Sequence, residues 1–123
     1  MRETRTRPAR LSLPTDRETL AYIAGILDGE GCITRANDHP IVQVGMTDEP
    51  VVRWLAQIGG TLRVEDGPNR GNRKPLYRWR LLAASDVEGF LRAVFPWLRV
   101  KRQQAENAIV EIEGLNISWL GEA

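Results

Sequence analysis

Apolar residues recur along this chain with two different periods. Leu20, Ile23 and Leu27 follow the spacing of one face of a helix, whereas 32–35 and 41–46 alternate apolar with polar residues, as half-buried strands do. The same succession then repeats. It predicts helices over about 16–30, 48–58, 85–94 and 100–113, and strands over 32–35, 41–46, 61–65 and 76–81.

Boundary residues support these elements. Thr15 with Glu18, and Ser85 with Glu88, form two capping boxes that predict the starts of the first and third helices. The segment Thr47-Asp48-Glu49-Pro50 carries helix-start signals for the second. Glycines at 59, 60 and 114 predict the ends of the second and fourth helices.

The two faces of the predicted sheet differ in character. Leu62, Val64 and Trp79, with Leu76 or Tyr77, belong to a buried face. The interleaved arginines at 63, 78 and 80 point the other way. The order helix, hairpin, helix, hairpin, helix, with one more terminal helix, predicts an α+β fold, an antiparallel four-stranded sheet with helices on one face. The other face is expected to be concave, polar and basic.

Composition predicts one globular domain over 15–123, preceded by a flexible basic arm over 1–14 that either is unstructured or contacts nucleic acid. The net charge of +1 points to no partner, but residues 61–80 contain six basic and two acidic side chains. Such a strip is typical of a nucleic-acid interface or of an ordinary solvated surface. The single cysteine and single histidine argue against a disulfide and a zinc cluster. Without a secretion signal or membrane span, a cytoplasmic or organellar protein is expected.

The end of the first predicted helix is unusual. Gly25 and Gly29 lie four residues apart on one face, where missing side chains let a second backbone come close. Asp28 and Glu30 lie at the C-terminal end, where the helix dipole disfavours negative charge. A divalent cation held by a carboxylate and a free carbonyl oxygen would compensate them.

These residues resemble a known family. The segment 23–31, Ile-Ala-Gly-Ile-Leu-Asp-Gly-Glu-Gly, is similar to the nonapeptide that names the LAGLIDADG homing endonucleases, with Glu30 in place of the more usual aspartate. The segment 95–105 resembles the family's later Pro-aromatic-Leu run followed by a lysine and glutamines. With the order of elements, αββαββα, the resemblance covers nearly all of the chain after residue 15.

The resemblance implies a set of catalytic residues. Glu30 and the backbone carbonyl of Gly29 would bind Mg²⁺ or Mn²⁺, and Lys101 would lie near the scissile phosphate. Gln43 is the candidate on the second strand for ordering the attacking water, although a surface role suits it equally well. Asp28 is expected to support the helix interface rather than to bind metal.

A single motif implies a homodimer. Its interface would contain Gly25, Asp28 and Gly29, would bring two Glu30 carboxylates close together, and predicts a pseudo-palindromic double-stranded DNA target. The candidate DNA-binding residues are Arg35, Arg63, Arg70, Arg73, Lys74, Arg78 and Arg80.

Two functions follow from the resemblance. One is a magnesium-dependent, site-specific DNA endonuclease that cuts both strands, of the kind encoded in mobile introns or inteins. The alternative is a catalytically reduced nucleic-acid-binding protein, an intron RNA maturase or a transcription regulator. Because Glu30 and Lys101 are both present, the sequence favours the enzyme.

Overall fold

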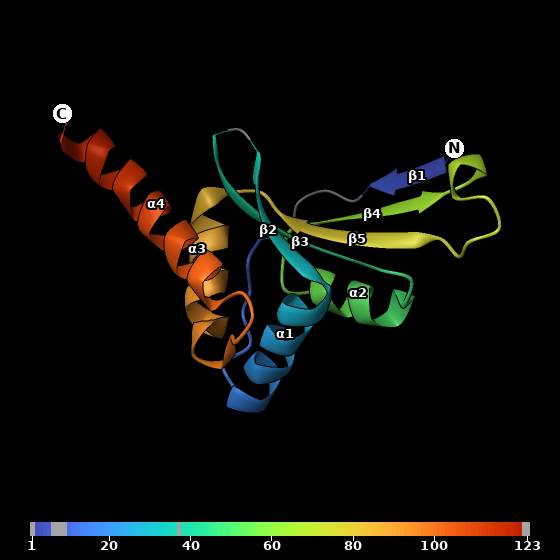
Figure 1. Ribbon diagram of the computed structural model, residues 1–123, viewed down its shortest axis with the longest axis horizontal. Coiled ribbons are helices and arrows are strands. Elements are labelled where there is room, and N and C mark those ends of the chain that lie inside the picture. Colours follow the sequence, from blue (N-terminus) through green and yellow to red (C-terminus); the bar gives the residue numbers. More distant parts are fainter. Residues whose placement is uncertain (1, 6–9, 37, 122–123) are drawn as a thin grey trace.

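A single antiparallel sheet carries helices on one side (Figure 1). The computed structural model describes residues 2–5, 10–36 and 38–121. The strands are β1 (Arg2–Arg5), β2 (Gly31–Ala36), β3 (His39–Met46), β4 (Thr61–Asp66) and β5 (Leu76–Leu81). The helices are α1 (Arg17–Glu30), α2 (Glu49–Ala56), α3 (Ala84–Val94) and α4 (Arg102–Gly121), with short 3₁₀ turns η1 (Pro68–Arg70) and η2 (Phe95–Trp97). The α+β class and all four predicted strands are confirmed.

The sheet joins two hairpins through their second strands. Its order is β1-β4-β5-β3-β2, and every neighbouring pair is antiparallel. Val44 on β3 lies opposite Trp79 on β5, and Gln43 lies opposite Arg80. Because paired residues share a face, the apolar and polar sets separate cleanly between the two sides. On β5, Tyr77 therefore shares the helix-covered face with Trp79 and is partly buried there, whereas Leu76 lies on the other face.

A fifth strand was not predicted. Residues 2–5 lie within the segment expected to be a flexible arm, yet they form β1 along the edge of β4. Their sequence, Arg-Glu-Thr-Arg, has no apolar alternation to reveal a strand. An edge strand pairs through its backbone groups and needs no such pattern. Further along the arm, Leu11 and Leu13 pack against the core.

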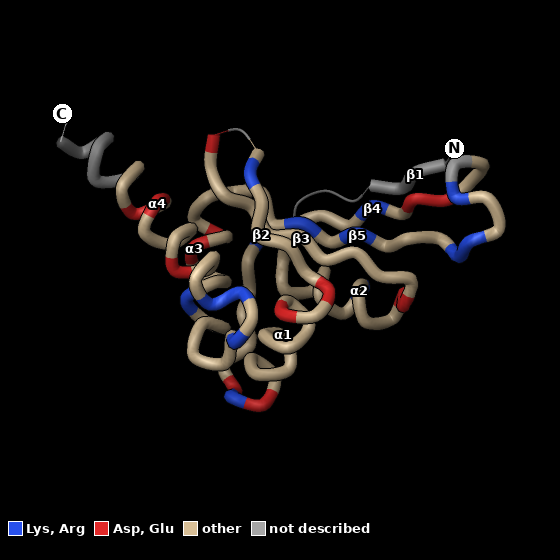
Figure 2. The backbone as a smooth tube through the Cα atoms, in the orientation of Figure 1, with Lys and Arg blue, Asp and Glu red and all other residues tan. Residues whose placement is uncertain are grey.

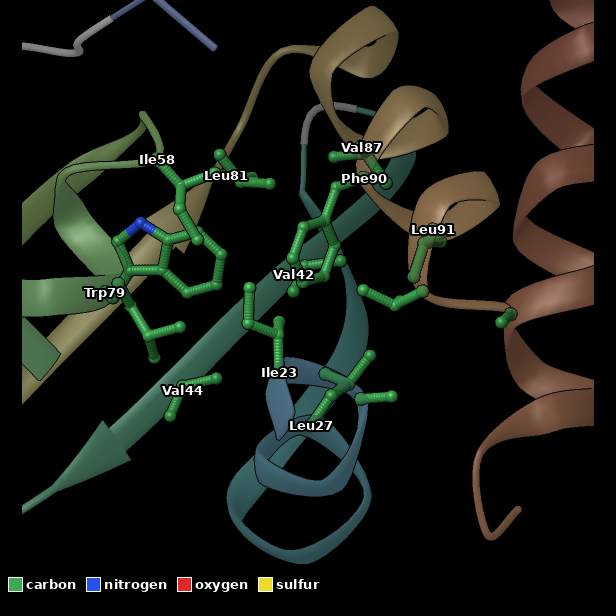
Figure 3. Close-up of a cluster of buried hydrophobic side chains, with 14 of the residues drawn as sticks. Ile23, Leu27, Val42, Val44, Ile58, Trp79, Leu81, Val87, Phe90 and Leu91 are labelled. Atoms are coloured by element: carbon green, nitrogen blue, oxygen red, sulfur yellow. The ribbon is translucent and has the colours of Figure 1, made fainter. Parts of the chain in front are cut away.

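The core lies between the sheet and the helices (Figure 3). Trp79 is fully buried at its centre, where its ring contacts Phe90 of α3 edge-on and its Nε1 donates to the Gly59 carbonyl at 2.8 Å. Ile23 and Leu27 of α1 are almost completely buried in the same cluster. Each such side chain contributes about 1.5–3 kcal/mol by leaving water. This packing fixes the face of α1 that points outward.

The helix starts differ from those predicted. The N-cap of α1 is Asp16, not Thr15, and its carboxylate accepts the Thr19 backbone N–H at 3.0 Å. Asp48 caps α2 in the same way. Helix α3 begins at Ala84, ahead of the predicted capping box, and its N-cap Ala83 has no capping side chain. Aspartate and threonine are both favoured N-cap residues. Where they are adjacent, the sequence does not decide which of the two caps the helix.

Helix α4 also runs further than predicted. Gly114 was expected to end it, but the helix continues to Gly121 and extends away from the rest of the molecule (Figure 1). A single interior glycine costs only about 1 kcal/mol relative to alanine, and no proline follows it. In the part of the chain that the structure describes, no helix is both long and apolar enough to cross a membrane.

Candidate active site and nucleic-acid interface

Helix α1 passes directly into strand β2. Gly31 is already extended, and its N–H donates to the Leu27 carbonyl. A side-chain carbon at Gly31 would lie 2.9 Å from that carbonyl oxygen, which is too close for any residue but glycine. The sharp change of direction needs this glycine. It leaves Glu30 at the junction of the helix and the sheet.

The Asp28 carboxylate holds the segment that precedes α4. Its Oδ2 accepts the backbone N–H of Arg99 at 2.8 Å, and its Oδ1 accepts those of Val100 and Lys101 at 3.2 and 3.0 Å. The Lys101 carbonyl in turn accepts from Ala105 in the first turn of α4. Asp28 therefore caps a helix to which it does not belong, where the positive end of the dipole favours a carboxylate.

The pKa of Asp28 reflects these contacts. Partial burial raises the pKa of its carboxyl, but the three backbone N–H groups and the nearby charge of Lys101 outweigh burial and bring it below the ordinary aspartate value. The Asp28 side chain is thus a charged structural link between α1 and α4.

Lys101 supplies the cation that the end of α1 lacks. Its Nζ donates to the Asp28 backbone carbonyl at 2.8 Å, one of the carbonyl groups left without a partner by the end of the helix. The last turn of α1 has no basic residue of its own. The acidic end of α1 and the basic segment before α4 lie side by side (Figure 2). The structure thus brings Lys101 to the end of α1 that carries Asp28 and Glu30.

Glu30 has a different environment from Asp28. Its side chain is exposed, and it makes no hydrogen bond or ion pair with the residues that the structure describes. Gly29 beside it is also exposed. Within those same residues, no three His, Cys, Asp or Glu side chains gather closely enough to hold a metal ion. One chain offers oxygen ligands of the right type at this point, but few of them.

Gln43 lies one strand away from this junction. It pairs with Cys32, two positions after Glu30, and on its other side with Arg80. Its side chain is half-buried on the sheet face that points away from the helices. Strand pairing therefore places Gln43 between Cys32, close after the end of α1, and Arg80 on the open face.

Arg63, Arg78 and Arg80 share this open face. Arg63 and Arg78 lie directly opposite each other on β4 and β5, and Arg80 lies opposite Thr61. Glu65 sits between the first two: its carboxylate accepts from Arg63 Nη2 at 2.8 Å and from Arg78 Nε at 3.1 Å. Hydrogen bonds from Arg78, and then from Arg63, outweigh burial and keep the pKa of Glu65 below its ordinary value.

The other predicted DNA-binding residues lie apart from this group. Arg73 and Lys74 are exposed in the β4–β5 loop, at the far end of the sheet (Figure 2). Arg70 turns back on the same loop and donates to the Lys74 carbonyl through Nε and Nη2. Arg35 is on the helix-covered side of β2, where it pairs with Glu111 of α4 at 2.6 Å. The structure does not bring Arg35 together with the open-face arginines.

The outward face of α1 has room for a second backbone. A methyl group added at Gly25 or Gly29 would meet no atom of the described residues within 4 Å. Tyr22, one turn before, is 54% exposed, and Ile26 is only partly buried. No contact in the described part of the chain therefore accounts for glycine at 25 and 29, each of which costs about 1 kcal/mol of helix stability.

Two interactions at this site were missed from the sequence. The spacing Arg63-x-Glu65 places both side chains on one face of a strand, and that signal could have identified Glu65 as a partner. The bonds from Asp28 to residues 99–101 join segments 71 to 73 positions apart, and no local pattern reveals them.

Comparison with known proteins identifies the fold. No protein-family model and no curated protein matches the chain. Solved structures of homing endonucleases do match the chain. I-CvuI bound to the I-CreI target with magnesium, its DNA uncleaved, aligns with a TM-score of 0.62 at 20% identity, over 79% of this chain and 67% of its own.

Two other homing endonucleases agree with this result. The archaeal intron-encoded I-Vdi141I complexed with DNA aligns with a TM-score of 0.56 at 17% identity, over 80% of this chain and 69% of its own. I-TnaI gives 0.58 at 15% identity, over 80% of this chain and 74% of its own. The chain thus has the fold of the LAGLIDADG homing endonucleases, and the resemblance stated from its sequence is confirmed at that level.

Proposed function

We propose that this protein is a site-specific DNA endonuclease that works as a homodimer and hydrolyses both strands of a long pseudo-palindromic site. One observation carries the proposal. The exposed Glu30 carboxylate and Lys101, which is anchored on the Asp28 carbonyl, both lie at the end of α1, where the chain enters edge strand β2 of the arginine-bearing sheet. The neighbours that share the fold include homing endonucleases solved on DNA.

The residues at the end of α1 suit a divalent metal in type. Hard cations such as Mg²⁺ or Mn²⁺ prefer carboxylate, carbonyl and water oxygens, which Glu30 and the Gly29 carbonyl would supply. When bound, such an ion lowers the pKa of water and stabilises charge on a leaving oxygen. The described residues of one chain offer too few donors for a complete site, whereas two chains meeting at Gly25 and Gly29 would contribute two Glu30 carboxylates.

The other residues have positioning and charge roles. Lys101 places a cation at the end of α1, where it would stabilise the negative charge that develops on a phosphate under attack. Asp28 is a positioning residue, because its carboxylate fixes the backbone on which Lys101 stands. Gln43 presents an amide on the open face, beside the first residues of β2, where it can hold a water molecule.

The open face would hold the DNA. A β-sheet with alternating basic side chains fits the major groove, where arginine reads guanine and also binds phosphate. Arg63, Arg78 and Arg80 lie in the middle of this face, with Arg73 and Lys74 at its far end to contact the backbone. Arg35 contributes least, because it points to the helix side.

A binding protein without cleavage is the second candidate. It is favoured by the small number of metal donors in a single chain, since a chain that stays monomeric would bind DNA or intron RNA and not cut. A monomer would therefore favour the binding protein, whereas a dimer is compatible with both functions.

A cleavage selection tests the proposal. The purified protein is incubated with a plasmid library of random inserts, once with Mg²⁺ and once with EDTA, and the cut ends are sequenced. Magnesium-dependent double-strand cuts at one recurring pseudo-palindrome are expected. Specific binding of one insert sequence without cutting would support the binding protein instead. Neither cutting nor binding of DNA would refute the endonuclease and leave RNA as the substrate to test for the binding protein.

A further inference from the structure

Glu65 occupies an unexpected place in the proposed DNA interface. It is an acid near the loop end of β4, on a face that would meet a polyanion, and it bonds to two of the arginines on that face. The three side chains are 18–29% exposed, so they are accessible but packed together. A purely electrostatic DNA-binding surface gains nothing from this carboxylate.

We propose that Glu65 is the specificity-determining residue of this interface: it aims Arg63 and Arg78 at base edges and keeps a backbone phosphate from binding them. The inference rests on the proposed function and assigns different roles to two groups of basic residues. The arginines held by Glu65 would select the sequence, whereas Arg73 and Lys74 in the loop would supply affinity for any DNA.

The geometry of Arg78 supports an orienting role. Its Nε and Nη2 face Glu65, while its Nη1 lies over Gly45 of β3, 3.8 Å from where a side-chain carbon would be. The guanidinium thus spreads from β4 to β3 across a position that has no side chain. Arginine has five N–H donors in a planar fork, so those not used by Glu65 remain for a base. An arginine already held in place loses less conformational entropy on binding.

The charges support the exclusion of phosphate. Glu65 places a negative charge between the two guanidinium groups, and its carboxylate stays ionised because hydrogen bonds from both arginines lower its pKa. A phosphate placed here would meet Glu65 as a like charge only a few ångströms away. A base edge carries partial charges and meets no such repulsion, and a cytosine or adenine amino group could even donate to Glu65.

Two substitutions separate charge from orientation. Glu65→Gln removes the charge and keeps the shape, whereas Glu65→Asp keeps the charge and moves it back by one methylene. Glu88→Gln is the matched control: Glu88 is also paired with an arginine, Arg92 at 3.0 Å, but lies on α3, on the side of the sheet opposite the open face. It changes the net charge equally.

Binding is measured by fluorescence anisotropy in EDTA, on the site selected by the wild-type protein and on a scrambled duplex, over a series of salt concentrations. Glu65→Gln should bind scrambled DNA about 3–10 times more tightly, with a salt slope steeper by about one, and lose at least about tenfold in the ratio of specific to scrambled affinity. Glu65→Asp should lose specificity without the steeper slope. Glu88→Gln should behave as wild type.

The outcomes distinguish the two levels of the argument. If the wild type discriminates between the duplexes and both Glu65 variants keep that ratio while showing wild-type thermal unfolding, the role of Glu65 is refuted and the proposed function stands. If Glu65→Gln fails to fold, the role of Glu65 is judged from the ratio of specific to scrambled affinity of the folded Glu65→Asp variant. If the wild type itself selects no DNA sequence, both the proposed function and the inference are overturned.

Discussion

Two carboxylates at the end of α1 have opposite environments. Asp28 is bonded to three backbone N–H groups of the segment before α4, and its own carbonyl accepts from Lys101. Glu30, two residues later, is exposed and makes no hydrogen bond or ion pair with the described part of the chain. Both carboxylates lie where the helix dipole disfavours negative charge. Among the described residues, only the Asp28 carboxylate is compensated by hydrogen bonds.

This difference teaches how to tell a structural acid from a functional one. A carboxylate whose lone pairs are all engaged stabilises the fold and has little left for a ligand. One that the fold leaves uncompensated is retained at a cost, which a ligand can offset when it binds. We therefore assign the link between helices to Asp28 and propose the metal-binding role for Glu30.

The largest expected effect on assembly comes from blocking the proposed dimer interface, which would bring two Glu30 residues together. Gly25→Leu fills the outward face of α1, so the dimer dissociation constant should rise at least about 100-fold, the usual scale of an interface clash, and cleavage should fall with it. The monomer itself should gain about 0.5–1 kcal/mol, because leucine is the better helix former and nothing within the chain obstructs it.

The matched control for this prediction is Gly114→Leu, at an equally open glycine on α4. It should raise helix stability and leave the dimer unchanged. Sedimentation velocity gives the mass and thermal unfolding gives the stability. A dimer that survives Gly25→Leu would exclude α1 as the interface.

The next effect concerns Asp28. Asp28→Ala leaves three backbone N–H groups without their acceptor, so the free energy of unfolding should fall by about 1–3 kcal/mol. Because the backbone N–H of Lys101 then loses its hydrogen bond to the Asp28 carboxylate, Lys101 is held less precisely, and cleavage should also fall, by about tenfold or more. Urea unfolding and a cleavage assay on the selected site measure the two losses.

Asp48→Ala separates stability from positioning. Asp48 caps α2 through the Val51 N–H at 3.2 Å, far from Lys101 along the chain. It should cost about 0.5–2 kcal/mol of stability and leave cleavage intact when assayed below its unfolding temperature. Equal loss of cleavage in both variants would remove the positioning role of Asp28.

The smallest effect is a dependence on pH. The pKa of Asp28 is lowered in the folded state, so its contribution to stability is complete above the unfolded value of about 3.9 and is lost as the pH falls through the folded value. The stability difference between wild type and Asp28→Asn should therefore shrink from pH 7 toward pH 3. Urea midpoints across this range measure it, and a constant difference would show that the charge of Asp28 is not what stabilises the link.

The sequence predicted those parts of the fold that depend on local patterns. Alternation on β4 and β5 put Trp79 inside and Arg63 and Arg78 outside, and the structure agrees. The helix starts were less certain, because adjacent Thr and Asp residues cap equally well and tertiary packing chooses between them. Strand β1 has no pattern of its own and depends on the edge of β4.

The candidate site was predictable in its residues but not in their partners. The resemblance pointed to Glu30 and Lys101, and the fold brings their segments together. From the sequence, Arg35 looked equivalent to the other arginines. However, side chains alternate between the two faces of a strand, and Arg35 falls on the helix-covered face of β2, where it pairs with Glu111. The hydrogen bonds of Asp28 to residues 99–101 could not be predicted from the sequence, because the two segments are far apart along the chain and meet only in the folded structure.

The most direct test of the central claim is Glu30→Gln, measured by cleavage of the selected site together with DNA affinity and thermal unfolding. Glu18→Gln, an exposed glutamate in the first turn of the same helix, is the control. Cleavage should fall by about three orders of magnitude, while affinity and stability stay within about 0.5 kcal/mol of wild type. Cleavage within tenfold of wild type, or a loss of stability like that expected for Asp28→Ala, would show that Glu30 is the structural acid and contradict the account.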